Sequence, residues 1–341
     1  MTTKSGLILA TAAVVGLVAL ALPALLPIFS LQLVIRGLYL GGVAMTFILL
    51  AGYGNMMSLA QMSFAAMAGY VVGIGTVKLG LPHGLLAPLA VAAATLLAAL
   101  FALVAIRGQK IYFLMMTLAL GQLFYGVGMQ WVSVTGGSYG FTGLTRPTIF
   151  GYSLVDAGPL YYLTLVVTIL SYLAMRRIVH SNFGLALRGI RDNPRRMAAL
   201  GFNVQLHRYV AIVISGAFAG VAGLMNTYFT GVISPSRAGL SQSVLVVMAA
   251  LLGGVDRLEG GILGGLVMAF LLSVTNEFTE RYWSIVGVLF ILVVRFMPDG
   301  LLGILPSLSR ARAGDAASGN PNAPTMFRIL NGLLADRSKS S

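Results

Sequence analysis

Two adjoining stretches decide the fold class: GIRDNPRRMAALGFN (189–203) and, four residues later, RYVAIVISGAFAGVAGLMNTYFT (208–230). The first carries three arginines, whereas the second has no charge beyond its first residue. A helix rises 1.5 Å per residue, so the second stretch is long enough to cross about 30 Å of hydrocarbon. A basic loop next to a run of spanning length is typical of a membrane protein.

The composition extends this pattern to the whole chain. Of the 341 residues, 58% are hydrophobic and 9% are charged, and the mean hydropathy is +0.91. Soluble domains carry about a quarter charged residues, so this chain is expected to face lipid. It has no cysteine, which excludes disulfides, thiolate metal sites and a cysteine nucleophile. The net charge of +13 does not indicate nucleic-acid binding, because the lysines and arginines are scattered among apolar runs.

The apolar runs predict an all-α polytopic protein with about ten transmembrane helices. The transmembrane domain covers 1–306. The eighth and ninth runs are the least secure, since only the glycine-rich GGVDRLEGG (253–261) separates them. The expected spans are 7–27, 31–50, 56–77, 84–106, 111–132, 160–178, 208–230, 241–255, 261–279 and 282–298.

Lysine and arginine set the expected orientation. With the N-terminus inside, 17 of them lie in cytoplasmic segments and 5 lie outside, and the opposite orientation inverts this split. Both termini are therefore expected in the cytoplasm. The start also matches a signal peptide ending at Ala19-Leu20-Ala21, so whether residues 1–22 are retained stays open; an uncleaved helix is favoured.

The tail over 307–341 changes composition abruptly. ARAGDAASGNPNAP (311–324) has little to bury and is expected to be disordered in the cytoplasm. MFRILNGLLADR (326–337) fits either an amphipathic helix on the membrane or a solvated tail, and the second is favoured.

Several chemistries lack the residues they need. His83, His180 and His207 are far apart and have no acidic neighbours at metal-ligand spacing. No HExxH motif and no Gly-Lys dipeptide occur, so the chain has no Walker A loop and no cofactor is expected. The nine acidic residues lie at loops or span ends, which leaves no intramembrane acid for ion coupling. Energy for active transport would have to come from a partner.

The basic loop carries helix signals. Asn182 is expected to cap one short helix that runs through Arg191, and Asn193-Pro194 starts a second of about two turns. Gly201 supplies a left-handed stop. Met197 and Leu200 are expected on one side of this helix, with Arg195 and Arg196 on the other. A plain basic loop on lipid headgroups explains the arginines but not the caps.

FGLALRGIRDNPRRMAALGFNV (183–204) resembles the cytoplasmic coupling segment of LivM-type permeases of the branched-chain amino-acid ABC importers. Four other passages occur in the family's order: AGYGNMMSLAQMSFAAMAGY (51–70), YFLMMTLALGQLF (112–124), TGGSYGFTGLTRP (135–147) and LLGGVDRLEGGILGG (251–265). The resemblance implies a BtuC/LivM-like inverted-repeat permease with a coupling loop at about 180–207. The residues it assigns to ATPase coupling are Arg188, Arg191, Asp192, Asn193, Pro194, Arg195, Met197, Leu200 and Gly201.

The same resemblance implies the partners and the cargo. It predicts a second, LivH-type permease subunit, two LivG/LivF-type ATPases that use the ATP, and a periplasmic substrate-binding protein, all at the bacterial inner membrane. Such a subunit is not an enzyme. Branched-chain amino acids, other small amino acids, urea and short amides are all compatible cargoes. The alternatives are a stand-alone secondary carrier or channel, which lacks an ion-coupling site here, and a membrane enzyme, for which no catalytic constellation is evident.

A weak internal repeat and scattered polar residues suggest where a path could run. LAQMSFAAMA (59–68) and LSQSVLVVMA (240–249) align at Leu, Gln, Met and Ala, in spans of opposite direction. Polar groups in hydrocarbon prefer the bundle interior, so lining a path and joining helices fit them equally well. The candidates are Ser58, Gln61, Ser63, Thr117, Gln122, Asn226 and Gln242.

The outer segment 133–159 contains TGGSYGFTG (135–143), a pliable loop by composition. Gly136 and Gly137 in that loop, with Arg146 and Arg237, are the candidates for docking the binding protein. A plain connector and contact with lipid headgroups are the alternatives.

Overall fold

The computed structural model describes residues 22–23, 27–108, 111–149, 152–154, 156–278, 287–288, 291 and 300–302. The expected first and tenth spans, 7–27 and 282–298, lie outside these residues apart from a few positions, and the tail 307–341 lies wholly outside them.

Among the described residues, the long apolar helices coincide with the eight middle spans that the sequence predicts, including the two least secure. Six are long and apolar enough to cross a membrane, while α3 and α11 are shorter. The eight helices together are α2 (Ile28–Gly54), α3 (Gln61–Val77), α4 (His83–Ala105), α5 (Ile111–Gln130), α7 (Ala157–Val179), α10 (Val204–Thr230), α11 (Leu240–Gly253) and α12 (Leu258–Phe278).

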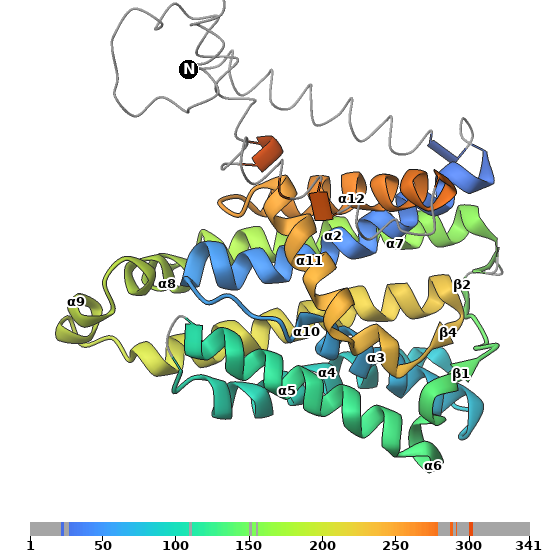
Figure 1. Cartoon of the computed structure of the whole chain (residues 1–341), viewed down its shortest axis with the longest axis horizontal. Coiled ribbons are helices and arrows are strands. Elements are labelled where there is room, and N and C mark those ends of the chain that lie inside the picture. Colours follow the sequence, from blue (N-terminus) through green and yellow to red (C-terminus); the bar gives the residue numbers. More distant parts are fainter. Residues whose placement is uncertain are drawn as a thin grey trace, which may run out of the picture.

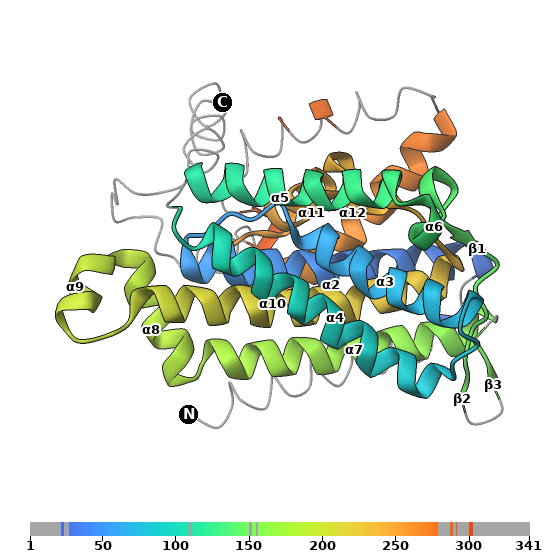
Figure 2. The same ribbon diagram turned by 90° about the horizontal axis from the view of Figure 1, so that it is seen from below.

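Short elements join these helices at two opposite ends of the bundle (Figure 1). One end holds α8 (Asn182–Asp192) and α9 (Pro194–Ala199), which project beyond the long helices in both views (Figure 2). The other end holds α6 (Val132–Thr135), the 3₁₀ turns η1 (Gly137–Tyr139) and η2 (Pro235–Ala238), and four two-residue strands. Of these strands, β1 (Phe141–Thr142) pairs antiparallel with β4 (Val232–Ile233), and β2 (Thr148–Ile149) with β3 (Tyr152–Ser153).

Basic residues gather at the end that carries α8 and α9. Within the described chain, the opposite half of the bundle has only Arg36, Lys78, Arg146 and Arg237. The α8–α9 end has Arg107, Arg176, Arg177, Arg188, Arg191, Arg195, Arg196, Arg208 and Arg257. The fold therefore separates the charges as the positive-inside rule leads one to expect.

Glycine and alanine let the long helices approach closely, which matters where lipid offers no hydrophobic drive for packing. A Cβ at Gly265 of α12 would lie 2.3 Å from the Gly41 nitrogen of α2. On the other side of the bundle, a Cβ at Gly216 of α10 would lie 2.1 Å from Ala98 Cβ of α4. The two long helices α2 and α10 are thus each closely packed against another helix, α2 against α12 and α10 against α4.

The two short helices occupy similar places in the chain. α3 follows the 27-residue α2 after the non-helical segment 55–60, and α11 follows the 27-residue α10 after segment 231–239. The helix after α3 packs against α10, and the helix after α11 packs against α2. The last helix of each series, α2–α3–α4 or α10–α11–α12, therefore packs against the first helix of the other series.

Candidate functional site

α8 is an amphipathic helix whose buried side faces the bundle. Ala186, Leu187 and Ile190 are buried, whereas Leu185 is 69% exposed. A Cβ at Gly184 would lie 2.2 Å from the Val179 carbonyl oxygen, so the corner between α7 and α8 requires glycine. The expectation that Asn182 caps this helix is wrong: Ser181 holds the N-cap position, and neither side chain makes a capping hydrogen bond.

α9 is built by local chemistry, as the sequence predicts. Asn193 Oδ1 accepts a hydrogen bond from the Arg196 backbone nitrogen at 3.0 Å, and Pro194 is the first helical residue. Such a cap contributes about 1 kcal/mol to helix stability. Gly201 has a φ of +88°, the left-handed conformation that ends the helix.

The two apolar residues of this second helix have different surroundings. Met197 turns back onto α8, where its sulfur lies 2.7 Å from the Cβ position of Gly189. Leu200 is 67% exposed, and Arg195 and Arg196 are exposed as well. Of the two apolar residues expected on one side of the helix, Met197 therefore packs within the chain and Leu200 stays exposed.

Other apolar side chains share this exposed end, and sequence reasoning missed them. Phe202 and Leu206 are exposed beside α9, and Leu185 is exposed on α8. The His207 ring stacks on Phe183 with centroids 5.8 Å apart and meets Phe202 edge-on, which fixes the connection into α10. No periodic pattern in such a short segment reveals which of these faces is free.

Arg188 and Arg191 point toward the bundle rather than away from it. The Arg188 guanidinium carbon lies 5.0 Å from the centroid of the Tyr53 ring, and its Nη2 donates to the Val179 carbonyl at 3.3 Å. Arg191 Nη1 donates to the Gly52 carbonyl, and its Nε lies 3.9 Å from Asp192 Oδ1. These arginines fasten α8 to the end of α2.

A buried polar cluster joins α2, α3 and α10. Gln61 Oε1 accepts hydrogen bonds from Thr46 Oγ1 at 3.0 Å and from Ser215 Oγ at 3.1 Å. All three residues are at most 1% exposed. Sequence reasoning found Gln61 but missed Thr46 and Ser215, because single hydroxyl residues are common on apolar helices.

A second set of polar groups holds the segment 55–60 that precedes α3. Thr117 Oγ1 of α5 accepts from the Leu59 backbone nitrogen at 3.2 Å, and Ser58 Oγ accepts from the Ala60 nitrogen at 3.3 Å. Ser63 is fully buried, and the Cβ position of Gly121 lies 3.3 Å from its Oγ. Non-helical backbone inside a bundle needs such partners.

The remaining path candidates do not join these clusters. Asn226 is buried in α10, Gln242 is half-buried in α11, and Gln122 is exposed on α5. Three of the path candidates have a buried polar atom without a hydrogen-bond partner in the described chain: Gln61 Nε2, Ser63 Oγ and Asn226 Oδ1. The seven predicted residues therefore occupy several places and do not form one site.

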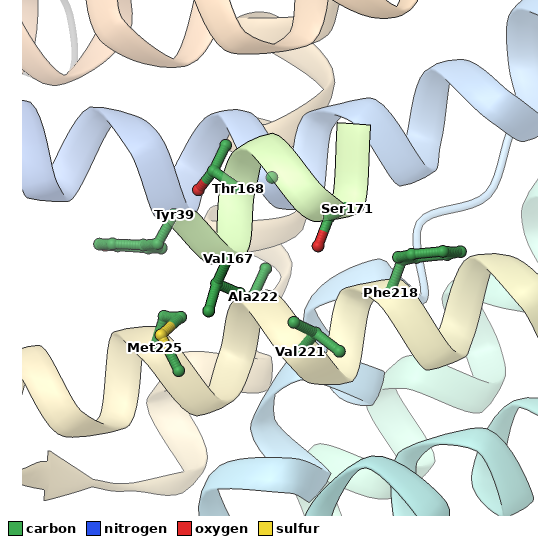
Figure 3. A pocket seen from close by; sticks show the side chains of 9 residues that line it. Tyr39, Val167, Thr168, Ser171, Phe218, Val221, Ala222 and Met225 are labelled. Carbon is green, nitrogen blue, oxygen red and sulfur yellow. The ribbon is translucent and has the colours of Figure 1, made fainter. Parts of the chain in front are cut away.

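Two cavities in the described part of the chain have linings that contain none of the path candidates. A closed space of about 10 Å³ between α2, α7 and α10 has room for one water molecule (Figure 3). An open apolar groove of about 810 Å³ runs along the outside of α4. The closed space is lined by Tyr39, Gly42, Val167, Thr168, Ser171, Phe218, Val221, Ala222 and Met225.

The glycine loop 135–143 lies at the end opposite α8 and α9 and makes several specific contacts there. Gly136 and Gly137 have φ values of +78° and +61°, which shape the turn η1. The pairing of β1 with β4 attaches the loop to the segment before α11. Lys78 Nζ also donates to the Ser133 carbonyl and lies 5.6 Å from the Phe141 ring centroid.

The two arginines expected to dock the binding protein, Arg146 and Arg237, lie at the end opposite α8 and α9. Arg146 is half-buried, and its Nη2 donates to the Phe229 carbonyl at 3.0 Å. Arg237 is half-buried in η2.

The letters GGSYG (136–140) match the GxSxG pattern of hydrolases. Ser138, however, lies in η1 and not on the strand-to-helix turn that holds a hydrolase nucleophile.

A protein-family model described as the branched-chain amino acid transport system permease component matches residues 29–294. The chain belongs to this family. This permease is 26% identical over 297 residues to the high-affinity branched-chain amino acid transport system permease protein LivM of Salmonella typhimurium, covering 80% of this chain and 68% of the relative.

Two proteins of Escherichia coli K12 are also similar to this permease. LivM is 26% identical over 283 residues, which cover 76% of this chain and 65% of that protein. LivH is 29% identical over 186 residues, which cover 51% of this chain and 59% of that protein. No solved structure matches the chain. The matched residues include α8 and α9, which we call the α8–α9 hairpin, and the helix series α2–α3–α4 and α10–α11–α12.

Proposed function

We propose that this chain is the membrane-spanning permease subunit of an ABC importer in the bacterial inner membrane. The capped α8–α9 hairpin at the basic end carries this proposal, because a family permease needs a rigid surface on the cytoplasmic side. The proposed topology has ten spans with both termini in the cytoplasm. The segregation of Lys and Arg to the α8–α9 end supports this orientation.

The proposed architecture is an inverted repeat of α2–α3–α4 and α10–α11–α12. It is supported by the packing of α4 on α10 and of α12 on α2, and by the breaks in the α-helix before α3 and α11. The aligned Gln61 and Gln242 lie in the first turns of these two helices. The cargo path is placed beside these helix starts, where Gln61 and Ser63 each have a buried polar atom without a partner in the described chain.

The proposed assembly contains a second permease subunit of the LivH type, two cytoplasmic ATPases that use the ATP, and a periplasmic binding protein. The similarity of this chain to both LivM and LivH proteins supports a related permease partner. On the inner side, exposed Leu200, Arg195 and Arg196 are proposed to dock an ATPase. On the outer side, the loop at Gly136 and Gly137, with Arg146 and Arg237, is proposed to meet the binding protein.

The proposed cargo is a branched-chain amino acid, because the LivM relatives are permeases of branched-chain amino acid transport systems. The test is reconstitution in proteoliposomes, with radiolabelled leucine, valine and urea offered separately. The complete assembly should accumulate leucine only with ATP and the binding protein, and this chain alone should accumulate nothing. Accumulation by this chain alone would contradict the proposal and favour a stand-alone carrier.

A further inference from the structure

α8 meets the last turn of α2 through three neighbouring contacts. Leu187 is fully buried, and its Cδ1 lies 3.6 Å from the Cβ position of Gly54. The Arg188 guanidinium lies over the Tyr53 ring, and Arg191 donates to the Gly52 carbonyl. Apolar packing, a cation–π contact and a backbone hydrogen bond thus all join one turn of α2 to one side of α8.

The last turn of α2 is itself held from the other side. A Cβ at Gly52 would lie 2.1 Å from the Val255 carbonyl oxygen in the connection between α11 and α12. Asp256, Arg257 and Glu259 lie close enough to interact electrostatically with the Tyr53 hydroxyl. Glu259 also accepts a hydrogen bond from Tyr172 of α7. The last turn of α2 therefore lies between α8 and the connection from α11 to α12.

The end of α2 is connected through the chain to the interior of the bundle. α2 continues directly into segment 55–60, whose backbone is held by Thr117, and then into α3 with Gln61. Along its length α2 is packed against α12 through Gly41 and Gly265. A displacement of α8 that carries the end of α2 with it must therefore move segment 55–60.

We propose that Tyr53 is a positioning residue for transport: with Arg188 on its ring, it makes α8 and the end of α2 move as one rigid body. Through this joint, a push on α9 reaches the segment before α3. The inference rests on the proposed function, since it assumes that an ATPase pushes on α9. It adds a residue of α2, outside the coupling loop, to the coupling machinery.

The absence of cysteine in the chain permits a direct test in the reconstituted assembly. Tyr53→Cys with Arg188→Cys should keep the ATPases bound but lower uptake per ATP hydrolysed about tenfold. A short bismaleimide joining the two cysteines should restore uptake, because the covalent link replaces the joint. If the link abolishes uptake while hydrolysis continues, α8 must move relative to α2 and the proposal is wrong. Normal uptake in the unlinked variant would equally contradict it.

Conservative substitutions separate this role from general stability. Tyr53→Phe keeps the ring face and should transport within twofold of the wild type, whereas Tyr53→Leu keeps bulk but loses the cation–π contact and should uncouple. Arg188→Lys keeps the charge but loses the planar stack and the forked donors, so it should uncouple partly. Equal uptake by the Phe and Leu variants would contradict the role of the ring.

A second measurement tests whether Tyr53 and Arg188 hold α8 to the end of α2, and it does not depend on the proposed function. Spin labels at Leu185→Cys and Met57→Cys, both exposed positions, report the distance between α8 and the segment directly after α2 in the full chain alone. The distance distribution should be narrow in the otherwise wild-type chain and with Tyr53→Phe, and broader with Tyr53→Leu. An equally narrow distribution with Tyr53→Leu would show that the ring does not hold the joint. Absence of ATP-driven uptake in the wild-type assembly would refute only the proposed function.

Discussion

Gly201 ends α9 through its backbone and not through a lack of space. Its φ is +88°, and nothing lies within 4 Å of the position that a Cβ would occupy. Gly201→Val should therefore cost about 1 kcal/mol, because a β-branched residue is strained in this conformation. Amide hydrogen exchange over 194–200 should become about fivefold faster. Gly201→Asn, which tolerates the left-handed region, is the control, and equal exchange in the two variants would contradict this account.

Residue chemistry also decides what the sequence could predict in the hairpin. Asn193, Pro194 and Gly201 act on their neighbours along the chain, so their roles in the cap and the stop follow from the sequence and are confirmed. The surroundings of Arg191 depend on Gly52, which is 139 residues away, and no local pattern reveals that contact. The same holds for Met197, whose contact with Gly189 requires the fold of the hairpin.

At the scale of elements, the seam between α2 and α12 depends on backbone approaching backbone. A Cβ at Gly265 would lie 2.3 Å from the Gly41 nitrogen, whereas at Gly84 of α4 nothing lies within 4 Å. Gly265→Ala should therefore lower stability by about 1–3 kcal/mol through overpacking. The thermal midpoint of the purified chain in detergent measures this effect, and Gly84→Ala is the matched control. A midpoint for Gly265→Ala at or above that of the control would show that the seam is looser than described.

Elements were predictable where hydrophobicity defines them. The eight middle spans follow from long, mainly apolar runs, and the structure has a helix in each. The path candidates were not resolved in this way, because an isolated Gln or Ser on an apolar helix gives no sign of its neighbours. Gln61 meets Thr46 and Ser215, while Gln122 lies exposed on another helix.

For the whole molecule, the orientation in the membrane has a direct readout in this cysteine-free chain. Tyr139→Cys lies in the outer glycine loop and Leu200→Cys lies in the hairpin, and both parent residues are well exposed, at 87% and 67%. A membrane-impermeant maleimide applied to intact spheroplasts should label only Tyr139→Cys. Leu200→Cys should react only after the membrane is opened. The reverse pattern would contradict the proposed topology.

The central claim is that an ATPase drives this permease through the exposed side of the α8–α9 hairpin. The most direct measurement is uptake per ATP hydrolysed, with co-purification of the ATPases, for Leu200→Asp in the complete assembly. Because Leu200 is exposed, the substitution should leave the fold intact while reducing both ATPase binding and leucine uptake about tenfold or more. Leu200→Met, which keeps the apolar contact, should behave as the wild type. If Leu200→Asp retains its ATPases and transports normally, the hairpin is only a basic loop at the membrane surface.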